Sequence, residues 1–213
     1  MSERQRPIYK NPWLWSFLAG AVLLAVIRPL FRNEPPPPPV LWQLPAFTLI
    51  DQRAKPLGSK ELRGKVYVAF FFFSHCKSIC PKLMKSMVGL QTRYDQWKTK
   101  GIRLIGFSVD PENDRPEKLA AFMRTYGGKP TRISLLTSAD GNEAPLRDLI
   151  IKGFKSHVGK PQKTSGMVDI AHSGKVALVD QQGRLRGYFD TNARGLDEVF
   201  HRSLHVWMEG RRR

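Results

Sequence analysis

Cysteine is scarce in this chain: its 213 residues include only two, Cys76 and Cys80. Both lie where an apolar run stops and a helical pattern begins, in the string FFFFSHCKSICP. A chain with so few thiols that places both at one junction uses them for chemistry. If the two sulfurs share one helix face, they can hold one soft ion or close on each other. The choice between metal and disulfide is therefore the functional question.

Acidic residues are also few, since 18 Asp and Glu stand against 35 Lys and Arg and the net charge is +17. The basic residues are spread along the chain, and the sequence lacks helix-turn-helix, zinc-finger and RNA-binding signatures. We therefore expect no nucleic-acid partner. Anionic lipid, an acidic partner protein and a merely solubilising charge remain as explanations of the excess.

An uncharged apolar segment occupies residues 13–27 and reads WLWSFLAGAVLLAVI. It is short for a membrane-spanning helix, which needs about 20 residues, so a cleaved signal peptide is the alternative. No small-x-small cleavage motif comes after the segment, and we expect an uncleaved single-pass anchor in residues 1–32. A signal anchor usually exports the part of the chain on its carboxyl side, which favours the periplasmic face of a bacterial inner membrane for the remaining residues.

Residues 33–41 form a linker that contains five consecutive prolines. A run of prolines adopts a stiff extended helix, so this segment is a spacer between the anchor and the domain. Residues 42–213 have a common size for a single domain and show no internal repeats.

The spacing of apolar residues in this domain predicts alternating strands and helices. Residues 66–73 (VYVAFFFF) are apolar on both faces, as in a central strand that is covered on both sides. An amphipathic helix is expected from Pro81 to about Gly101. The other expected elements are strands at 46–51, 102–109 and 132–137, helices at 116–126, 143–153 and 196–208, and a hairpin of 175–180 with 184–189.

This order predicts an α/β domain with a mixed central sheet flanked by helices. Two cysteines at the first strand-to-helix junction are the thioredoxin-like arrangement. A helix N-terminus and the cationic neighbours His75 and Lys77 favour thiolate over thiol, so both thiols are expected to ionise more easily than free cysteine.

Two thiolates are an incomplete shell for most metals, so we expect a third ligand among the histidines. His172 is the best placed, because it precedes the strand 175–180 and this loop faces the cysteine helix in a thioredoxin-like fold. Thiolates with one imidazole suit Cu(I) and tolerate Cu(II), and zinc is the chemical rival. The other histidines are better explained as solvated or as a neighbour of the site: His157, His201, His205 and His75.

Three segments resemble the Sco/SenC family: FFSHCKSICP at 72–81, SVDPENDRP at 108–116, and His172 ahead of VDQQG and RGYF at 179–189. Members are membrane-anchored, thioredoxin-like copper proteins that help to assemble the binuclear copper centre of cytochrome c oxidase. The resemblance covers roughly residues 47–200 and implies Cys76, Cys80 and His172 as copper ligands. The chain departs at residues 77 and 78, Lys and Ser, where members often carry Pro and Asp.

By this resemblance, the protein is a metallochaperone that carries Cu(I) or Cu(II) and is not a turnover enzyme. Its partners would be the copper-bearing subunit of cytochrome c oxidase, a copper donor protein and the membrane. The alternative is a thiol–disulfide oxidoreductase in which Cys76 and Cys80 are catalytic and reduce the cysteines of an exported partner. His172 separates the two functions, because disulfide exchange needs no distant imidazole. A peroxiredoxin is weaker still, since its reactive cysteine usually lacks so close a partner.

Two aspartates, Asp110 and Asp114, also match family positions. Each has a structural explanation, because an aspartate at a strand end or beside a helix start caps backbone N–H groups. For Asp110 a role behind the copper ligands is the second hypothesis.

Overall fold

A computed structural model describes residues 11–27, 37–156 and 174–211. The chain forms two compact units, Met1–Pro36 and Pro37–Arg213. The first unit contains helix α1 (Pro12–Ile27), which has 16 residues. Within the described ranges, no helix combines the length and apolar character needed to cross a membrane. The three-part division of the chain at residues 32 and 41 stays a prediction.

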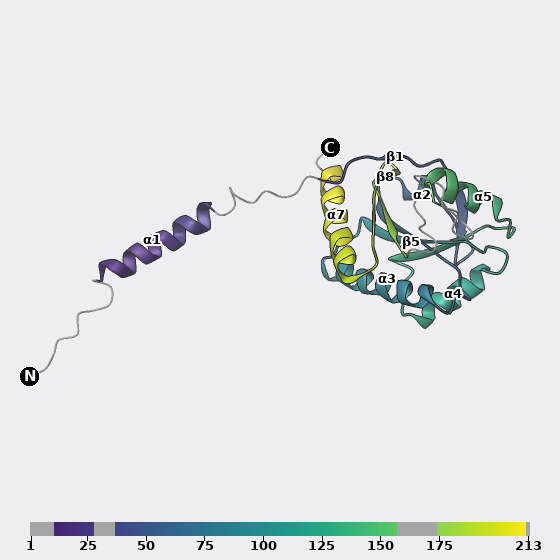
Figure 1. Ribbon diagram of the computed structural model, residues 1–213, viewed down its shortest axis with the longest axis horizontal. Helices are drawn as coiled ribbons and strands as arrows, with labels where there is room; N and C mark the ends of the chain where they lie inside the picture. Colours follow the sequence, from purple (N-terminus) through teal and green to yellow (C-terminus); the bar gives the residue numbers. More distant parts are fainter. Residues whose placement is uncertain (1–10, 28–36, 157–173, 212–213) are drawn as a thin grey trace, which may run out of the picture. The chain divides into compact units, whose positions relative to one another are not determined.

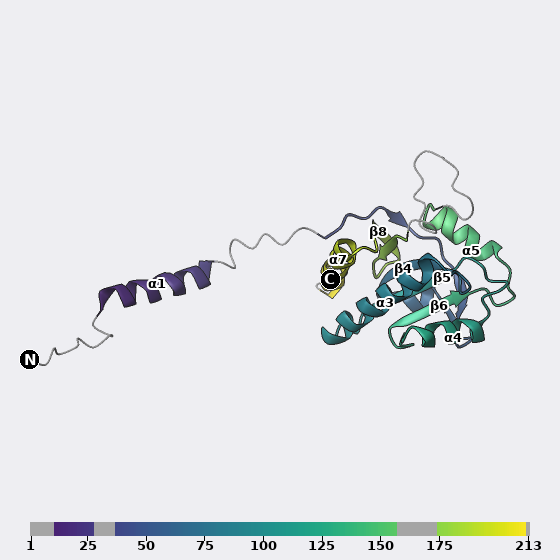
Figure 2. The ribbon, with the colours of Figure 1, turned by 60° about the horizontal axis from the view of Figure 1, so that its bottom comes forward.

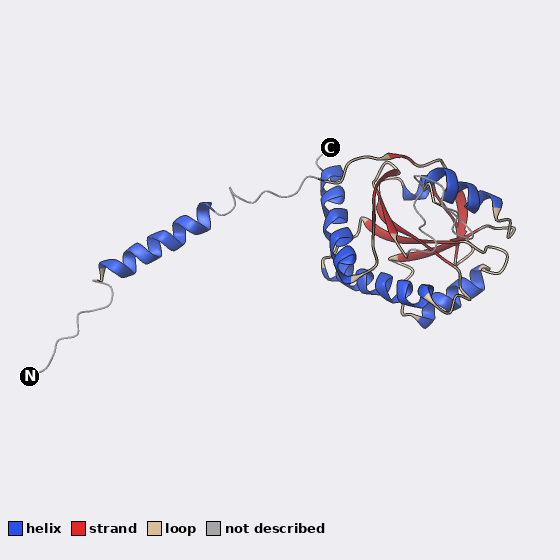
Figure 3. Ribbon diagram, in the orientation of Figure 1, coloured by secondary structure: helices blue, strands red, loops and turns tan. Residues whose placement is uncertain are grey.

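The second unit is built on one eight-stranded sheet with the spatial order β1-β8-β7-β4-β5-β6-β2-β3. Figure 3 shows the strands in red and the helices around them in blue. The β4–β5 and β5–β6 pairs are parallel and the other neighbours are antiparallel, so the predicted mixed sheet is confirmed. The strands are β1 (Trp42–Gln43), β2 (Thr48–Asp51), β3 (Pro56–Gly58), β4 (Val66–Phe72), β5 (Ile102–Ser108), β6 (Ile133–Thr137), β7 (Val176–Val179) and β8 (Arg184–Phe189).

Helices cover both faces of this sheet (Figures 1 and 2). The covering elements are α2 (Ser59–Leu62), α3 (Ile79–Gln96), α4 (Pro116–Thr125), α5 (Ala144–Asp148), a π-helical turn η2 (Leu149–Gly153) and α7 (Ala193–Arg211). Apolar residues of α3, α4 and α7 pack on one face, and those of α2, α5 and η2 pack on the other.

Strand β4 explains why both faces must be covered. All seven of its residues are buried, and Val68 and Phe70 belong to one core cluster while Ala69 and Phe71 belong to the other. Successive side chains of a strand point to opposite faces, so a strand that is apolar throughout is stable only between two layers. The predicted central strand is therefore confirmed.

Three local features differ from the sequence-based expectations. Helix α3 begins at Ile79, two residues before Pro81, and the segment 149–153 is a π-helical turn. The short edge strands β1 and β3 were not predicted, because two or three residues carry no readable period and their pairing depends on neighbours that are distant in sequence. The predicted hairpin is present as β7 and β8.

The second unit contains the whole sheet and both core clusters. No core side chain comes from residues 1–36 among those that are described. Residues 37–213 therefore hold the apolar contacts that a domain needs to fold by itself.

Packing at Gly106 in β5 gives a test of this core. A Cβ at this position would lie 2.7 Å from side-chain carbons of Leu135 and Phe70, so Gly106→Ala should lower the free energy of unfolding by about 1–3 kcal/mol. Gly89 in α3 has nothing within 4 Å, and Gly89→Ala should raise it by about 0.5–1 kcal/mol. Urea unfolding of residues 37–213 measures both, and shifts of the same sign would contradict the packing.

Candidate dithiol and metal site

The two cysteines lie where the connection from β4 enters α3, at the carboxyl end of the parallel strands. Val109 N–H donates to the Phe72 carbonyl at 2.9 Å, and Cys76 N–H donates to the Phe73 carbonyl at 3.2 Å. These bonds end the strand and turn the chain toward the helix. Cys80 is the second residue of α3, whereas Cys76 precedes the helix. The expectation that both cysteines share one helix face is therefore wrong, because the helix starts between them.

A hydrogen bond nevertheless joins the two residues. Cys80 N–H donates to the Cys76 sulfur at 3.5 Å, and the Ser78 hydroxyl oxygen lies 3.6 Å from the same sulfur. Both cysteines are free thiols and both are buried, with Cys76 at 9% exposure and Cys80 at 2%. The first N–H groups of a helix have no intrahelical acceptor, so the start of α3 supplies a donor to the Cys76 thiolate.

The two thiols differ in acidity. Burial raises the pKa of Cys76, but hydrogen bonds from Cys80 and Ser78 outweigh this effect and bring the pKa down from 9.0 to about 7. Burial raises the pKa of Cys80 to about 12, and the neighbouring Cys76 and Asp114 charges add to this rise. Easier ionisation was predicted for both thiols; the structure supports it for Cys76 and contradicts it for Cys80, because Cys80 is the more deeply buried.

Asp114 holds the cysteine loop in place. Its side chain is fully buried and accepts hydrogen bonds from Ser74 N–H, from the Ser74 hydroxyl and, at 2.6 Å, from the Ser108 hydroxyl. These bonds tie the loop after β4 to the end of β5. The structural explanation of Asp114 is therefore the one that its contacts support. Ser74 and Ser108 were not singled out from the sequence, since isolated serines carry no signal of their own.

Asp110 lies next to His75 beside this loop. The His75 Nδ1 atom is 3.6 Å from an Asp110 carboxylate oxygen, and the His75 ring packs 4.8 Å from the Phe73 ring, centroid to centroid. Asp110 also accepts hydrogen bonds from the Asn113 side chain. In the described part of the chain, His75 makes no hydrogen bond to either sulfur, so its contacts are those of a neighbour of the site.

The predicted third ligand, His172, lies outside the described residues, as does His157. On α7 the side chain of His201 is 55% exposed and lies 3.6 Å from Asp197, as expected for a solvated residue. Residues 11–27, 37–156 and 174–211 contain no group of three or more His, Cys, Asp and Glu that could hold a metal. The third ligand that the sequence predicts is therefore not among the described residues.

The chain re-enters the fold close to the cysteines. Strand β7 pairs antiparallel with β4, so its start lies toward the carboxyl end of β4. Just before β7, Gly174 has a φ of +64°, and a Cβ there would lie 2.9 Å from the Ile79 Cδ1 atom. Gly174 thus packs against the first residue of α3, next to Cys80.

Two aromatic residues hold the chain where it leaves η2. The Trp42 indole N–H donates to the Gly153 carbonyl at 2.7 Å, and the Tyr188 hydroxyl donates to the Phe154 carbonyl. Trp42 comes from the edge strand β1 and Tyr188 from the neighbouring strand β8, and only the β1–β8 pairing, which was not predicted, brings them together. No sequence signal indicates either contact.

The difference in acidity predicts selective alkylation by iodoacetamide. The rate at Cys76 should rise with pH through about 7 and then level off, because the thiolate reacts and the thiol does not. Cys76→Ser should abolish this phase, and Ser78→Ala should move its midpoint to higher pH, because the hydroxyl stabilises the thiolate. Mass spectrometry of the alkylated peptides measures the rates. A midpoint near the ordinary value of 9.0 would contradict the assignment.

The fold and the thiol pair at its first parallel strand-to-helix junction define a thioredoxin-like dithiol protein. The chain belongs to the SCO1/SenC family, because the SCO1/SenC family model matches residues 43–207. It is similar to the SCO1 protein homolog of Bacillus subtilis (strain 168), with 31% identity over 147 residues, 69% of this chain and 73% of the relative.

Solved structures agree with this membership. One is BsSco, described as a member of the Sco family of cytochrome c oxidase assembly proteins with a disulfide switch; it is 27% identical, with a TM-score of 0.68 over 80% of this chain and 95% of BsSco. Another is yeast Sco1 with copper bound, 21% identical, with a TM-score of 0.59 over 75% of this chain and 87% of that protein. At this lower identity the yeast structure shows the shared fold alone.

Proposed function

We propose that this protein carries copper as cargo for the binuclear copper centre of cytochrome c oxidase. In this proposal the thiolates of Cys76 and Cys80 and the imidazole of His172 hold the ion. A donor protein supplies the copper, and the copper-bearing subunit of the oxidase receives it. The observation that carries the proposal is the pair of free thiols joined by one hydrogen bond at the start of α3.

The chemistry of the thiol pair fits copper. Thiolates are soft ligands that favour Cu(I), and an added imidazole makes Cu(II) acceptable. Cys76 has a pKa of about 7, so a large part of it is thiolate at neutral pH. Cys80 has a pKa of about 12 and would release its proton when the metal binds, which couples copper affinity to pH.

The position of Gly174 supports His172 as the third ligand. His172 is two residues before Gly174, and two extended residues span at most about 7 Å. Because Gly174 packs against Ile79 at the start of α3, an imidazole two residues upstream has the cysteines within its range. Among the histidines in the described ranges, His75 adjoins Cys76 but contacts Asp110 and Phe73 and makes no hydrogen bond to either sulfur, and His201 is exposed on α7.

Family membership supports the client, because BsSco is described as belonging to a family of cytochrome c oxidase assembly proteins. The departure of this chain at Ser78 is compatible with the same site, since its hydroxyl lies 3.6 Å from the Cys76 sulfur and helps to stabilise the thiolate.

A second function is favoured by the unequal acidity of the thiols. A Cys76 thiolate that attacks a partner disulfide forms a mixed disulfide and expels one partner thiolate. Cys80, once deprotonated, attacks the Cys76 sulfur, expels the second partner thiolate and leaves a Cys76–Cys80 disulfide. Two electrons pass to the partner. The disulfide switch described for BsSco agrees with this alternative.

The N-terminal unit supports a membrane location in this proposal. Helix α1 has no charged residue, and the apolar residues Leu30 and Phe31 come after it in the sequence. We place a single-pass anchor in residues 1–32, with the linker 33–41 and the copper-binding domain 42–213 on the exported side. The periplasm is an oxidising compartment in which the two thiols can form a disulfide.

Copper binding by a His172→Ala variant tests the proposed ligand. The affinity for Cu(II) should fall by at least about 100-fold. Replacing a residue that only hydrogen-bonds to a metal ligand costs up to about 100-fold, and a ligand itself should matter at least as much. Reversible disulfide formation with glutathione should persist. The thiolate-to-Cu(II) charge-transfer absorption of residues 37–213 measures the first effect and a redox titration the second. His201→Ala, an exposed histidine on α7, is the matched control. Equal copper retention by both variants would refute the copper proposal and leave the oxidoreductase.

Extraction of the full chain tests the anchor. The full chain should sediment with membranes and resist alkaline extraction, because burial of an apolar helix is insensitive to salt and pH. A chain that starts at residue 33 should be released by the same treatment. Digestion of the domain by protease added to spheroplasts would place it outside the inner membrane. Alkaline release of the full chain would contradict the anchor.

A further inference from the structure

The end of the domain opposite the cysteines carries a group of basic residues that take no part in the proposed copper site. They lie in the turn before β4, in the turn between α3 and β5, and at the end of α7. Together with the neighbouring Trp97 they form what we call the basal surface, which consists of Arg63, Lys65, Trp97, Lys98, Lys100 and Arg211. Apart from Lys65, which is half-buried, these residues are exposed.

These three segments are in contact and form one surface. Val66 N–H donates to the Gly101 carbonyl at 3.0 Å, so the turns that precede β4 and β5 lie side by side. The Trp207 side chain packs against Gly101, where an added Cβ would meet it. Trp207 also lines a hollow together with Arg63 and Arg211.

The charge of this surface is not balanced by nearby carboxylates. Within the described part of the chain, Arg63, Lys98, Lys100 and Arg211 have no ion pair, and the Lys65 ammonium donates only to the Glu61 carbonyl. The Glu61 carboxylate accepts a hydrogen bond from Gly58 N–H, and the other nearby acidic side chains are bound to other cations. Asp95 pairs with Lys129 and Arg132, Asp180 with Arg184 and Arg186, and Glu209 with Arg186.

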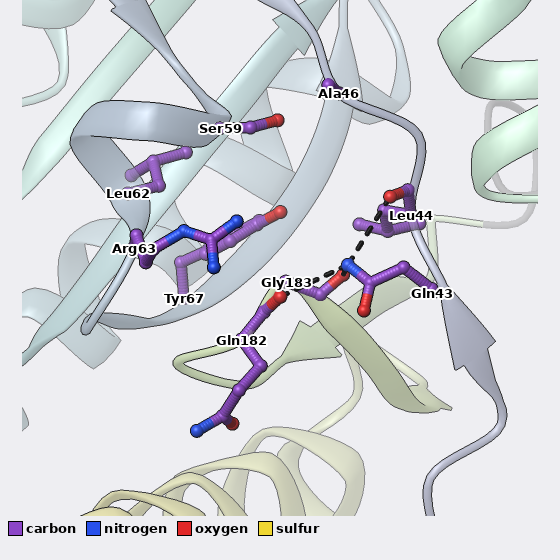
Figure 4. A pocket seen from close by; sticks show the side chains of 9 residues that line it. All are labelled: Gln43, Leu44, Ala46, Ser59, Leu62, Arg63, Tyr67, Gln182 and Gly183. Atoms are coloured by element: carbon purple, nitrogen blue, oxygen red, sulfur yellow. Dashed lines mark hydrogen bonds between the residues drawn. The ribbon is translucent and has the colours of Figure 1, made fainter.

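Arg63 also borders a second hollow, which Figure 4 shows from close by. Tyr67, which is buried to 2% exposure, lines the same hollow. Gln43 and Gln182 line the same hollow, and no carboxylate does. Arg63 thus lines both hollows, and no carboxylate lines either of them.

Two further features indicate which kind of surface this one contacts. Trp97 is 62% exposed, and an exposed tryptophan among lysines is typical of residues at a membrane interface. The linker also joins the domain at this end, since the Arg186 guanidinium donates to the Pro38 carbonyl at 2.7 Å and pairs with Glu209 on α7 at 3.0 Å. An anionic bilayer attracts clustered lysine and arginine and accepts an interfacial tryptophan.

We propose that the basal surface rests on the anionic phospholipid surface of the membrane. Strand β4 separates this surface from the cysteine loop, and its seven residues span about 20 Å. The bound domain would therefore hold its thiols away from the lipid and toward a protein partner. This inference goes beyond copper transport and requires neither helix α1 nor copper.

Vesicle sedimentation of residues 37–213 tests the proposal without the anchor. The domain should bind vesicles of phosphatidylcholine with phosphatidylglycerol at low salt, and should not bind pure phosphatidylcholine. The triple variant Arg63→Gln, Lys98→Gln, Lys100→Gln should bind roughly 100-fold more weakly, because each basic residue near an anionic surface contributes about a fivefold gain and three are removed. Circular dichroism and copper binding check that the variant is folded.

The matched control removes the same charge from elsewhere. Lys85, Lys118 and Arg124 are exposed on α3 and α4 and have no ion pair in the described ranges, so their triple replacement by Gln should weaken vesicle binding much less. Equal weakening by both variants would show that only the net charge matters and would overturn the proposal. So would binding to polyglutamate with the same dependence on the basal residues but no binding to vesicles, which would indicate an acidic protein instead.

Discussion

The complete burial of β4 is the constraint on which the rest of the domain depends. A strand that is apolar on both faces must be covered on both, and the two helical layers and the two core clusters result from this requirement. The strand must also end where its chain can be solvated. Its carboxyl end delivers the cysteine loop to the start of α3, and its amino end lies among basic turns. The position of the thiols is thus fixed by the core.

Hydrogen bonds then make two similar thiols chemically unequal. Cys76 lies before the helix and receives donors from Cys80 and Ser78, whereas Cys80 is buried within the first turn. The buried Asp114 keeps the cysteine loop in this position by accepting hydrogen bonds from Ser74 and Ser108. The pKa of Cys76 is therefore brought down to about 7, while burial raises the pKa of Cys80 to about 12. Both proposed functions use this inequality.

The two ends of the sheet carry opposite kinds of surface. At the carboxyl ends of β4 and β5 the polar groups are bound to one another around the cysteines, and at the amino ends several cations have no ion pair among the described residues. The linker joins the domain at the basic end through Pro38. In our proposals the basal surface faces an anionic membrane, and the cysteine loop at the opposite end faces a protein partner. Both proposals, copper transfer to a protein partner and contact with an anionic membrane, depend on this division.

The sequence by itself determined the central strand, the order of the main elements, the hairpin and the importance of Cys76 and Cys80, because these depend on local period and residue chemistry. It also carried the family resemblance that the match over residues 43–207 confirms. Only the tertiary structure decided that α3 starts between the cysteines, that Asp114 binds Ser74 and Ser108, and that Trp42 meets Tyr188. These features depend on contacts between residues far apart in the chain, and burial and pairing at that distance leave no periodic trace in the sequence.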